Sequence, residues 1–132
     1  MRRYILLLML AATGVSAAPR NGLYTEEQAR AGGEIYSQRC AMCHGKMLEG
    51  TFEIPALQGR FVAHWSNAPL SMLYDYIGRA MPQFAPGSLT PDENAKVMAF
   101  LLQQNGQPSG SDTLPASSSA LQAVKLGKGG GR

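Results

Sequence analysis

The sequence is poor in the residues that usually bind metal ions. Its 132 residues include two cysteines and two histidines. Cys40, Cys43 and His44 lie within one short stretch, and His64 stands apart. A structural zinc site normally needs four Cys or His ligands, so zinc would have to recruit all four residues, which their spacing does not require. A disulfide between the two cysteines would close too small a loop to add much stability.

The sequence also carries little net charge. The formal charge is +3, and removal of a leader that contains Arg2 and Arg3 would leave 10 basic residues against 9 acidic ones. No dense cluster of Lys and Arg precedes the C-terminal tail. A charge this small argues against nucleic-acid binding, and it predicts only modest long-range attraction between the protein and its partners.

Long hydrophobic runs are missing as well. The apolar run Tyr4–Ala12 is too short to span a bilayer with ease. It follows a positively charged start and precedes small residues, which is the pattern of a secretory signal peptide. We therefore predict a signal peptide over residues 1–18, cleaved after Ala17 or Ala18, and a short N-terminal segment over 19–23. Cleavage would leave no stable membrane insertion, and an uncleaved N-terminal membrane anchor is the alternative.

What the sequence does contain is Cys40-Ala41-Met42-Cys43-His44, which has the C-x-x-C-H spacing of covalent haem attachment. Two thiols at this spacing can add to the two vinyl groups of a haem, and the adjacent histidine can then bind the iron. A C-x-x-C pair can also be a thioredoxin-like redox pair, which normally lies between a strand and a helix. No alternating β-branched strand precedes Cys40, so the pattern favours haem over this pair, zinc or a disulfide.

The first predicted helix begins after Thr25. Thr25 and Gln28 have the spacing of a capping box, in which the hydroxyl accepts from the Gln28 amide and the Gln28 side chain bonds back. Four residues then follow at spacings of four, four and three, which places them on one helix face: Gly32, Tyr36, Cys40 and Cys43. This helix would present both cysteines on one side. Glycine inside a helix costs about 1 kcal/mol relative to alanine, and close approach of another helix would explain it.

The second predicted helix spans about residues 69–79. An amphipathic stripe at i, i+3, i+4 and i+7 is formed by Leu70, Leu73, Tyr74 and Ile77. Pro82 prevents this helix from continuing and favours an extended backbone at Met81. The segment before the helix, residues 45–68, is predicted to be an irregular loop because glycine and proline recur in it.

The last predicted helix has the clearest boundaries. Thr90, Pro91 and Glu93 have the spacing of an N-cap, a first-turn proline and a capping box. Asn105 and Gly106 supply a left-handed stop. The apolar face of this helix contains Val97, Met98, Phe100, Leu101 and Leu102. The three helices define one predicted domain over residues 24–106.

From Gln107 the composition shifts to proline, serine, glycine and alanine. We predict that residues 107–132 form an extension to the domain. Residues 116–125 could form one short helix within it, and residues 128–132 should be disordered. Docking to a partner is one role for this extension.

A haem iron held by one histidine has a sixth position, and seven methionines are candidates for it. Two leave with the signal peptide, two lie too close to His44 to reach the opposite haem face, and two lie on helices where they are not needed as ligands. These six are Met1, Met9, Met42, Met47, Met72 and Met98. Met81 remains, 37 residues after His44 and next to the stiff Pro82. We predict Met81 as the axial ligand, with His64 as the runner-up.

Taken together, these residues resemble a class I cytochrome c over about residues 24–106. The matching parts beyond the haem motif are Gly32-x-x-x-Tyr36, Pro55-Ala56-Leu57-x-Gly59, Met81-Pro82 and Val97-x-x-Phe100. The resemblance implies an all-α cytochrome c fold, with about three main helices and irregular loops wrapped around one covalently bound haem c and its iron. Gly32 and Tyr36 would cross the last helix near the Val97-x-x-Phe100 pattern, which accounts for the costly glycine.

The resemblance also implies roles in the haem pocket. The Pro55 carbonyl would accept a hydrogen bond from Nδ1–H of His44, which fixes the imidazole ring and raises its basicity. Arg60 and Trp65 are candidates for contacts with the haem propionates. Their alternatives are a solvated arginine and a packed tryptophan.

By resemblance, the protein is a periplasmic electron carrier rather than an enzyme, because bacterial haem c is attached outside the cytoplasm. The run Met81–Thr90 is similar to cytochromes associated with quinoprotein alcohol dehydrogenases. We therefore expect redox-protein partners that meet it through a small, transient interface. A quinoprotein dehydrogenase would be the donor and a terminal oxidase the acceptor, and the chain could be the electron-transfer subunit of a dehydrogenase complex.

Two other function classes stay open. A haem-based ligand-binding or peroxidase-like protein would have a vacant or labile sixth position, where Met81 is predicted. A haem-free thiol–disulfide protein would use Cys40 and Cys43 directly. The occupant of the sixth position separates the first of these classes from an electron carrier, and the presence of haem separates the second.

Overall fold

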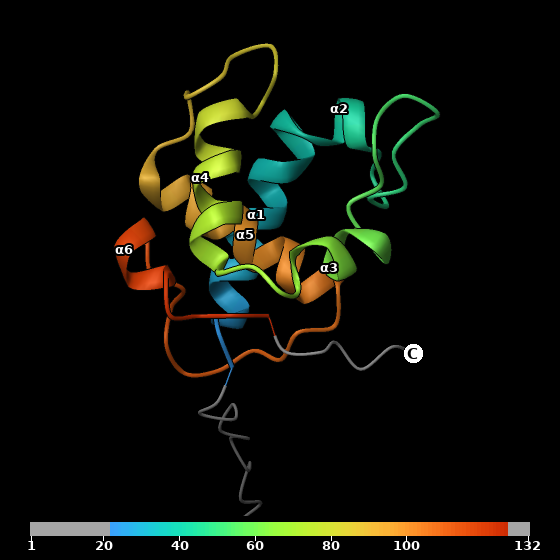
Figure 1. Ribbon diagram of the computed structural model, residues 1–132. Coiled ribbons are helices and arrows are strands. Elements are labelled where there is room, and N and C mark those ends of the chain that lie inside the picture. The colour runs from blue at the N-terminus through green and yellow to red at the C-terminus, as the bar shows by residue number, and fades with distance from the viewer. Residues whose placement is uncertain (1–21, 127–132) are drawn as a thin grey trace, which may run out of the picture.

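The structure, a computed structural model, describes residues 22–126 (Figure 1). Its helices are α1 (Glu26–Arg39), α2 (Ala41–His44), α3 (Arg60–Trp65), α4 (Leu70–Ala80), α5 (Pro91–Gln104) and α6 (Ser118–Leu121). The described residues contain no strand, only an isolated bridge between Pro69 and Lys125, so the predicted all-α fold is confirmed. Within the same residues, every helix is too short or too polar to cross a membrane. The predicted signal peptide and the predicted disorder of residues 128–132 lie outside the described part of the chain.

Helix α1 begins at its predicted N-cap. The Thr25 hydroxyl accepts a hydrogen bond from the Gln28 amide at 3.1 Å. The second half of the predicted capping box is wrong, because the Gln28 side chain is buried and bonds to the backbone of Leu114 instead.

The chain turns at Cys40, between α1 and α2. Cys40 has a φ of −121° and a ψ of −38°, so the predicted single helix that would carry both cysteines is divided at this residue. The Tyr36 hydroxyl donates a hydrogen bond to the carbonyl of Gly45 at 2.7 Å. In a straight helix these two residues would be about 13 Å apart along the axis. The division of the helix therefore lets the end of α2 return to α1.

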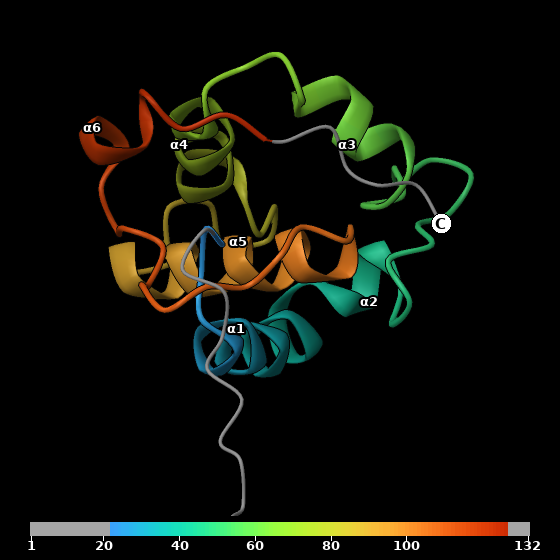
Figure 2. The same ribbon diagram turned by 90° about the horizontal axis from the view of Figure 1, so that it is seen from below.

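Helix α1 packs across α5, and Figure 2 shows the two lying side by side. A Cβ atom at Gly32 would overlap the carbonyl oxygen of Lys96, so only glycine allows the two backbones to come this close. The rings of Tyr36 and Phe100 pack one turn away, with their centroids 5.1 Å apart. The predicted crossing of these two helices is confirmed.

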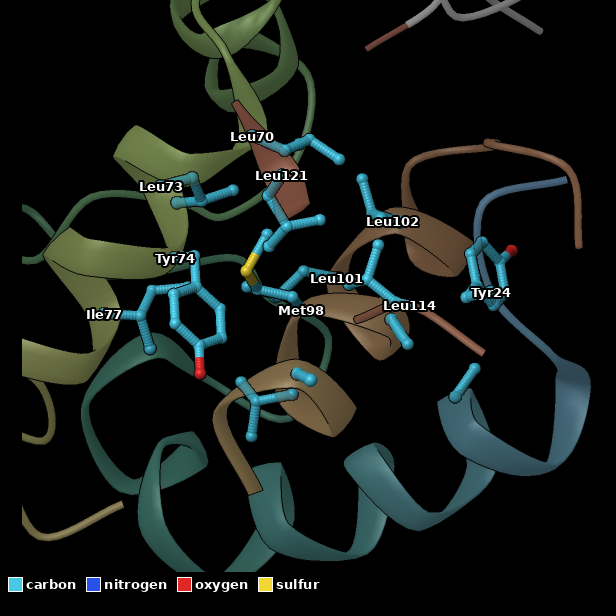
Figure 3. Close-up of a cluster of buried hydrophobic side chains, with 14 of the residues drawn as sticks. Tyr24, Leu70, Leu73, Tyr74, Ile77, Met98, Leu101, Leu102, Leu114 and Leu121 are labelled. Carbon is cyan, nitrogen blue, oxygen red and sulfur yellow. The ribbon is translucent and has the colours of Figure 1, made fainter. Parts of the chain in front are cut away.

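The hydrophobic core lies between α4, α5 and the C-terminal extension (Figure 3). The stripe predicted on α4 is buried, and it comprises Leu70, Leu73, Tyr74 and Ile77. From α5, Met98 is fully buried among these side chains, as expected of a core residue, and Met72 is exposed, as its place off the stripe predicted.

The boundaries of α4 and α5 lie close to the predicted ones. Helix α4 ends at Ala80, and Met81 follows with the predicted extended backbone, at a φ of −120° and a ψ of 151°. At the start of α5, the Thr90 hydroxyl accepts from the Glu93 amide at 3.2 Å, and the Glu93 carboxylate accepts from the Thr90 amide at 2.8 Å. The capping box predicted here is therefore confirmed in full.

The first part of the extension, residues 107–116, runs back past the start of α1. The Tyr24 hydroxyl donates a hydrogen bond to the Gln107 carbonyl at 2.6 Å. The side-chain amide of Gln28 donates through Nε2 to the carbonyl of Leu114 at 2.9 Å. The backbone amide of Leu114 donates to Oε1 of Gln28 at 2.7 Å. Gln28 thus holds both backbone groups of one extension residue.

The second part of the extension packs on α4. Figure 1 shows α6 beside α4, and the Leu70 amide donates to the Val124 carbonyl at 2.8 Å. Helix α6 covers Ser118–Leu121 and is shorter than the helix predicted over 116–125. Three extension leucines are buried in the core: Leu114, Leu121 and Leu126. The extension therefore contributes to the same core as the helices.

Candidate haem site

The two cysteines of the C-x-x-C-H motif have different environments. Cys40 is half-buried at the junction of α1 and α2, Cys43 is exposed on α2, and both are unpaired thiols. Burial raises the pKa of the Cys40 thiol to about 11. Cys40 is therefore mostly protonated near neutral pH. Residues 22–126 contain no group of three His, Cys, Asp or Glu side chains able to hold a metal ion, so His64 does not complete a zinc site.

The His44 ring is oriented by a backbone carbonyl. Its Nδ1 lies 3.0 Å from the carbonyl oxygen of Pro55, the pair expected from the resemblance. A carbonyl oxygen can only accept a hydrogen bond, so Nδ1 is the donor, and in the neutral ring the lone pair lies on Nε2. A histidine held in this way is prepared to bind a metal through Nε2.

The loop that supplies Pro55 folds back on α2. The Gly50 amide donates to the His44 carbonyl at 2.8 Å, and the Leu57 amide donates to the Leu48 carbonyl at 2.9 Å. Gly50 has a φ of +66°, a conformation that glycine adopts without strain. These bonds close the loop and bring the Pro55 carbonyl under the histidine ring.

Met81 lies on a separate segment of the site. It caps the C-terminus of α4, where its amide donates to the Ile77 carbonyl at 2.9 Å, and its side chain is half-buried against the hydrophobic core. In Figure 1 the C-terminal end of α4 and helix α2 lie at the same end of the molecule. Helix α2, which ends at His44, and the end of α4, which leads to Met81, therefore lie at one end of the fold.

Helix α3 lies within the segment that was predicted to be an irregular loop. It carries Arg60 and His64, which are exposed, and Trp65, which is half-buried. The Trp65 ring lies 5.1 Å from the His64 ring and 6.1 Å from the Tyr76 ring, measured between centroids. Trp65 thus packs in an aromatic cluster between α3 and α4, and Arg60 extends from the start of α3.

Two contacts that support the site were not predicted from the sequence. The Tyr36 hydroxyl holds the Gly45 carbonyl, directly after the haem motif. The side-chain amide of Asn105 donates through Nδ2 to the Leu57 carbonyl at 2.9 Å, which ties the Pro55 loop to the end of α5. The sequence predicted Asn105 only as part of a helix stop and Tyr36 only as a residue at the helix crossing. Neither prediction indicated these hydrogen bonds.

Comparison with known proteins identifies the family of the chain. Residues 27–101, which contain both the C-x-x-C-H motif and Met81, match the family described as cytochrome c oxidase, cbb3-type, subunit III. The chain belongs to this family. This cytochrome is also similar to a chain in the crystal structure of the sulfane dehydrogenase SoxCD from Paracoccus pantotrophus. The two share 25% sequence identity with a TM-score of 0.58, and the match covers 96% of this chain and 67% of that chain.

No curated protein matches the chain with significance. The family match and the solved structure agree in class, so the protein is a class I c-type cytochrome with the all-α cytochrome c fold. Its activity is haem-based electron transfer between redox partners.

The residues of this cytochrome fit a haem by their chemistry. Cys40 and Cys43 offer two unpaired thiols at the spacing of the two vinyl groups. His44 offers Nε2 as the ligand atom, because Nδ1 is engaged by the Pro55 carbonyl. Met81 offers a soft thioether at a half-buried position.

Proposed function

We propose that this cytochrome carries one electron at a time through a single covalent haem c, with His44 and Met81 as the axial iron ligands. The haem supplies the one-electron redox chemistry, and the protein orients it and excludes water. The observation that carries the proposal is the 3.0 Å contact between Nδ1 of His44 and the Pro55 carbonyl. It leaves Nε2 of a histidine next to two unpaired thiols available to a metal.

The other residues of the site have supporting roles in this proposal. Met81 is a neutral, soft ligand that favours ferrous iron and raises the reduction potential relative to a second histidine. Arg60 and Trp65 contact the haem propionates. Trp65 does so from the aromatic cluster with Tyr76, which restricts its ring.

We also propose a place for the protein in the cell. The N-terminal signal pattern and the requirement of haem c attachment favour a periplasmic protein, released by cleavage after Ala17 or Ala18. It acts as a carrier or as the electron-transfer subunit of a dehydrogenase complex. The likeness to a sulfane dehydrogenase supports a dehydrogenase as the donor, of the quinoprotein type that the Met81–Thr90 run resembles, and the oxidase family supports a terminal oxidase as the acceptor.

The presence and attachment of the haem are tested by a pyridine haemochrome spectrum of the protein expressed in the periplasm. We expect the spectrum of a haem with two thioether bonds, and colour that remains with the protein after denaturation. Cys43→Ser should shift the spectrum toward that of a haem with one saturated vinyl group. A colourless wild type with two titratable thiols would end the proposal in favour of a thiol–disulfide protein.

The sixth ligand is tested by Met81→Ala, with His64→Ala as the matched control. We expect the ferric wild type to be low-spin with a sulfur-to-iron charge-transfer band. Met81→Ala should lose this band, and His64→Ala should keep it, because only a thioether gives this transition. A high-spin wild type that binds carbon monoxide readily would instead identify a ligand-binding or peroxidase-like protein.

A further inference from the structure

A buried side-chain amide of α5 bonds to the middle of α4. Asn94, near the start of α5, is 2% exposed, and its Nδ2 donates a hydrogen bond to the carbonyl of Tyr74 at 2.8 Å. One turn further along α4, Gly78 faces the same amide, and a Cβ atom at Gly78 would lie 2.8 Å from Nδ2. The amide group therefore fills the space that a side chain at Gly78 would need.

The stability of the fold does not account for an asparagine at this position. Its Oδ1 is buried, and none of the described residues lies within hydrogen-bond distance of it. A buried acceptor of this kind destabilises a fold, and a leucine of similar size would remove it. The Tyr74 carbonyl lies inside α4, where the helix's own amides can also satisfy it. What Asn94 adds is a directional bond between two helices.

This bond lies in the middle of α4, and Gly78, which also faces the amide, belongs to the turn that leads to Met81. Met81 follows Gly78 by three residues, and its amide is bonded to the Ile77 carbonyl in the same final turn. The beginning of α4 is held elsewhere, by the C-terminal extension: the Leu70 amide bonds to the Val124 carbonyl at 2.8 Å. The extension thus holds the beginning of the helix, and the Asn94 amide holds its middle and faces the turn before Met81.

We propose that Asn94 is a positioning residue for Met81. By holding Tyr74 and Gly78 of α4 against α5, it would position the Met81 thioether to bind iron. The proposal rests on the proposed function, in which Met81 is the axial ligand. Residues that orient a metal ligand without touching the metal typically change metal affinity by 10–100-fold when they are replaced.

The test uses two variants that remove the same contact from opposite sides. Asn94→Leu keeps the size of the side chain and removes both polar atoms. Gly78→Ala places a Cβ against Nδ2 and displaces the amide, while it raises the helix propensity of α4. Imidazole is titrated into each ferric holoprotein, and loss of the sulfur-to-iron band reports the displacement of Met81. The urea midpoint of each holoprotein is measured alongside.

Both variants should bind imidazole at least about tenfold more tightly than the wild type, because Met81 competes less well. A merely structural role would lower their urea midpoints and leave the imidazole affinity at the wild-type value. Gln28→Ala is the control, because it removes another buried amide, far along the chain from Met81; it should lower the urea midpoint and leave imidazole affinity unchanged. If both variants bind imidazole with wild-type affinity, Asn94 has no positioning role, and the proposed ligand Met81 is unaffected. If the wild type itself lacks the sulfur-to-iron band, Met81 is not the ligand.

Discussion

Two threonine N-caps, Thr25 and Thr90, are each followed three residues later by a side chain able to complete a capping box. Glu93 returns to its N-cap amide, whereas Gln28 bonds to Leu114, 86 residues away. Glu93 carries a carboxylate, which can only accept, and its hydrogen bonds to Thr90 are exposed to solvent. Gln28 is buried, and its amide can both donate to and accept from one backbone residue. The same local pattern therefore has two outcomes, and the tertiary neighbour decides between them.

At the residue scale, Glu93 should make stability depend on pH. Hydrogen bonds from the Thr90 backbone and side chain lower the pKa of the Glu93 carboxyl. Its contribution is therefore full at neutral pH and is lost as the pH falls through the lowered pKa. Glu93→Gln should lose less than about 1 kcal/mol at pH 7, because the pair is exposed to solvent.

The measurement is urea unfolding of holoprotein at neutral and at acidic pH. The difference between Glu93→Gln and wild type should shrink as the pH drops below the usual range of glutamate, about 4.3. Glu27→Gln, which changes an exposed acid in the first turn of α1, serves as the control. A constant difference at every pH would show that the carboxylate charge is not involved.

At the scale of elements, the long helices were predictable and the short ones were not. Helices α1, α4 and α5 have apolar stripes and recognisable ends, so their patterns survive any tertiary arrangement. Helix α3 has six residues and follows Gly59 without a side-chain cap, so glycine and proline around it suggested only a loop. The division at Cys40 was also missed, because it depends on the bond between Tyr36 and the Gly45 carbonyl. The haem motif itself was predictable because its chemistry lies within five consecutive residues.

The loop between α4 and α5 is tied to the end of α1. The Arg39 guanidinium donates to the Ser88 hydroxyl at 2.5 Å, and Leu89 beside it is buried. Arg39 directly precedes the haem motif, and the loop begins at Met81. The Arg39 side chain, which is half-buried, therefore links the two segments that supply the axial ligands in the proposed function.

Removal of this link should loosen the loop with little effect on global stability. Ser88→Ala and Arg39→Ala should each lower the free energy of unfolding by less than about 1 kcal/mol, because the bond is exposed. Amide hydrogen exchange should become faster at Ala85 and Ser88, whose amides bond within the loop. Arg30→Ala, which breaks an exposed pair inside α1, is the control and should leave the loop unchanged. Unaltered exchange in both loop variants would mean that Leu89 alone holds the segment.

At the scale of the whole molecule, the C-terminal extension is part of the fold. Residues 107–126 are tied to Tyr24 and Gln28 at one side and to α4 at the other. Their composition suggested an extension beyond the domain and gave no sign of a core, because three leucines separated by seven and five residues have no helical or strand period. Only the three-dimensional fold shows that these leucines are buried in the same hydrophobic core. Asn94 escaped prediction for a related reason, since a single polar residue on an apolar helix face gives no sign of its partner on α4.

Two truncations separate a structural extension from a docking tail. A chain that ends at Leu126 keeps every described contact of the extension, and its holoprotein should melt at the wild-type temperature. A chain that ends at Gly106 loses the bonds from the Gln28 side chain to Leu114 and from the Leu70 amide to Val124. It also loses the three buried leucines. Truncation of a single buried leucine typically costs about 2–5 kcal/mol, and a whole domain of this size is stable by only about 5–15 kcal/mol.

The chain that ends at Gly106 should therefore melt far below the wild type or fail to fold, and Leu121→Ala should lie between them because Leu121 is fully buried. Thermal unfolding followed by circular dichroism at equal haem content measures all three variants. If the chain that ends at Gly106 melted with the wild type and only its electron transfer to a redox partner slowed, the extension would be a docking element. Leu121→Ala still gives an answer if the chain that ends at Gly106 cannot be isolated. Replacement of a core leucine lowers the melting temperature, whereas replacement of a leucine in a docking tail does not.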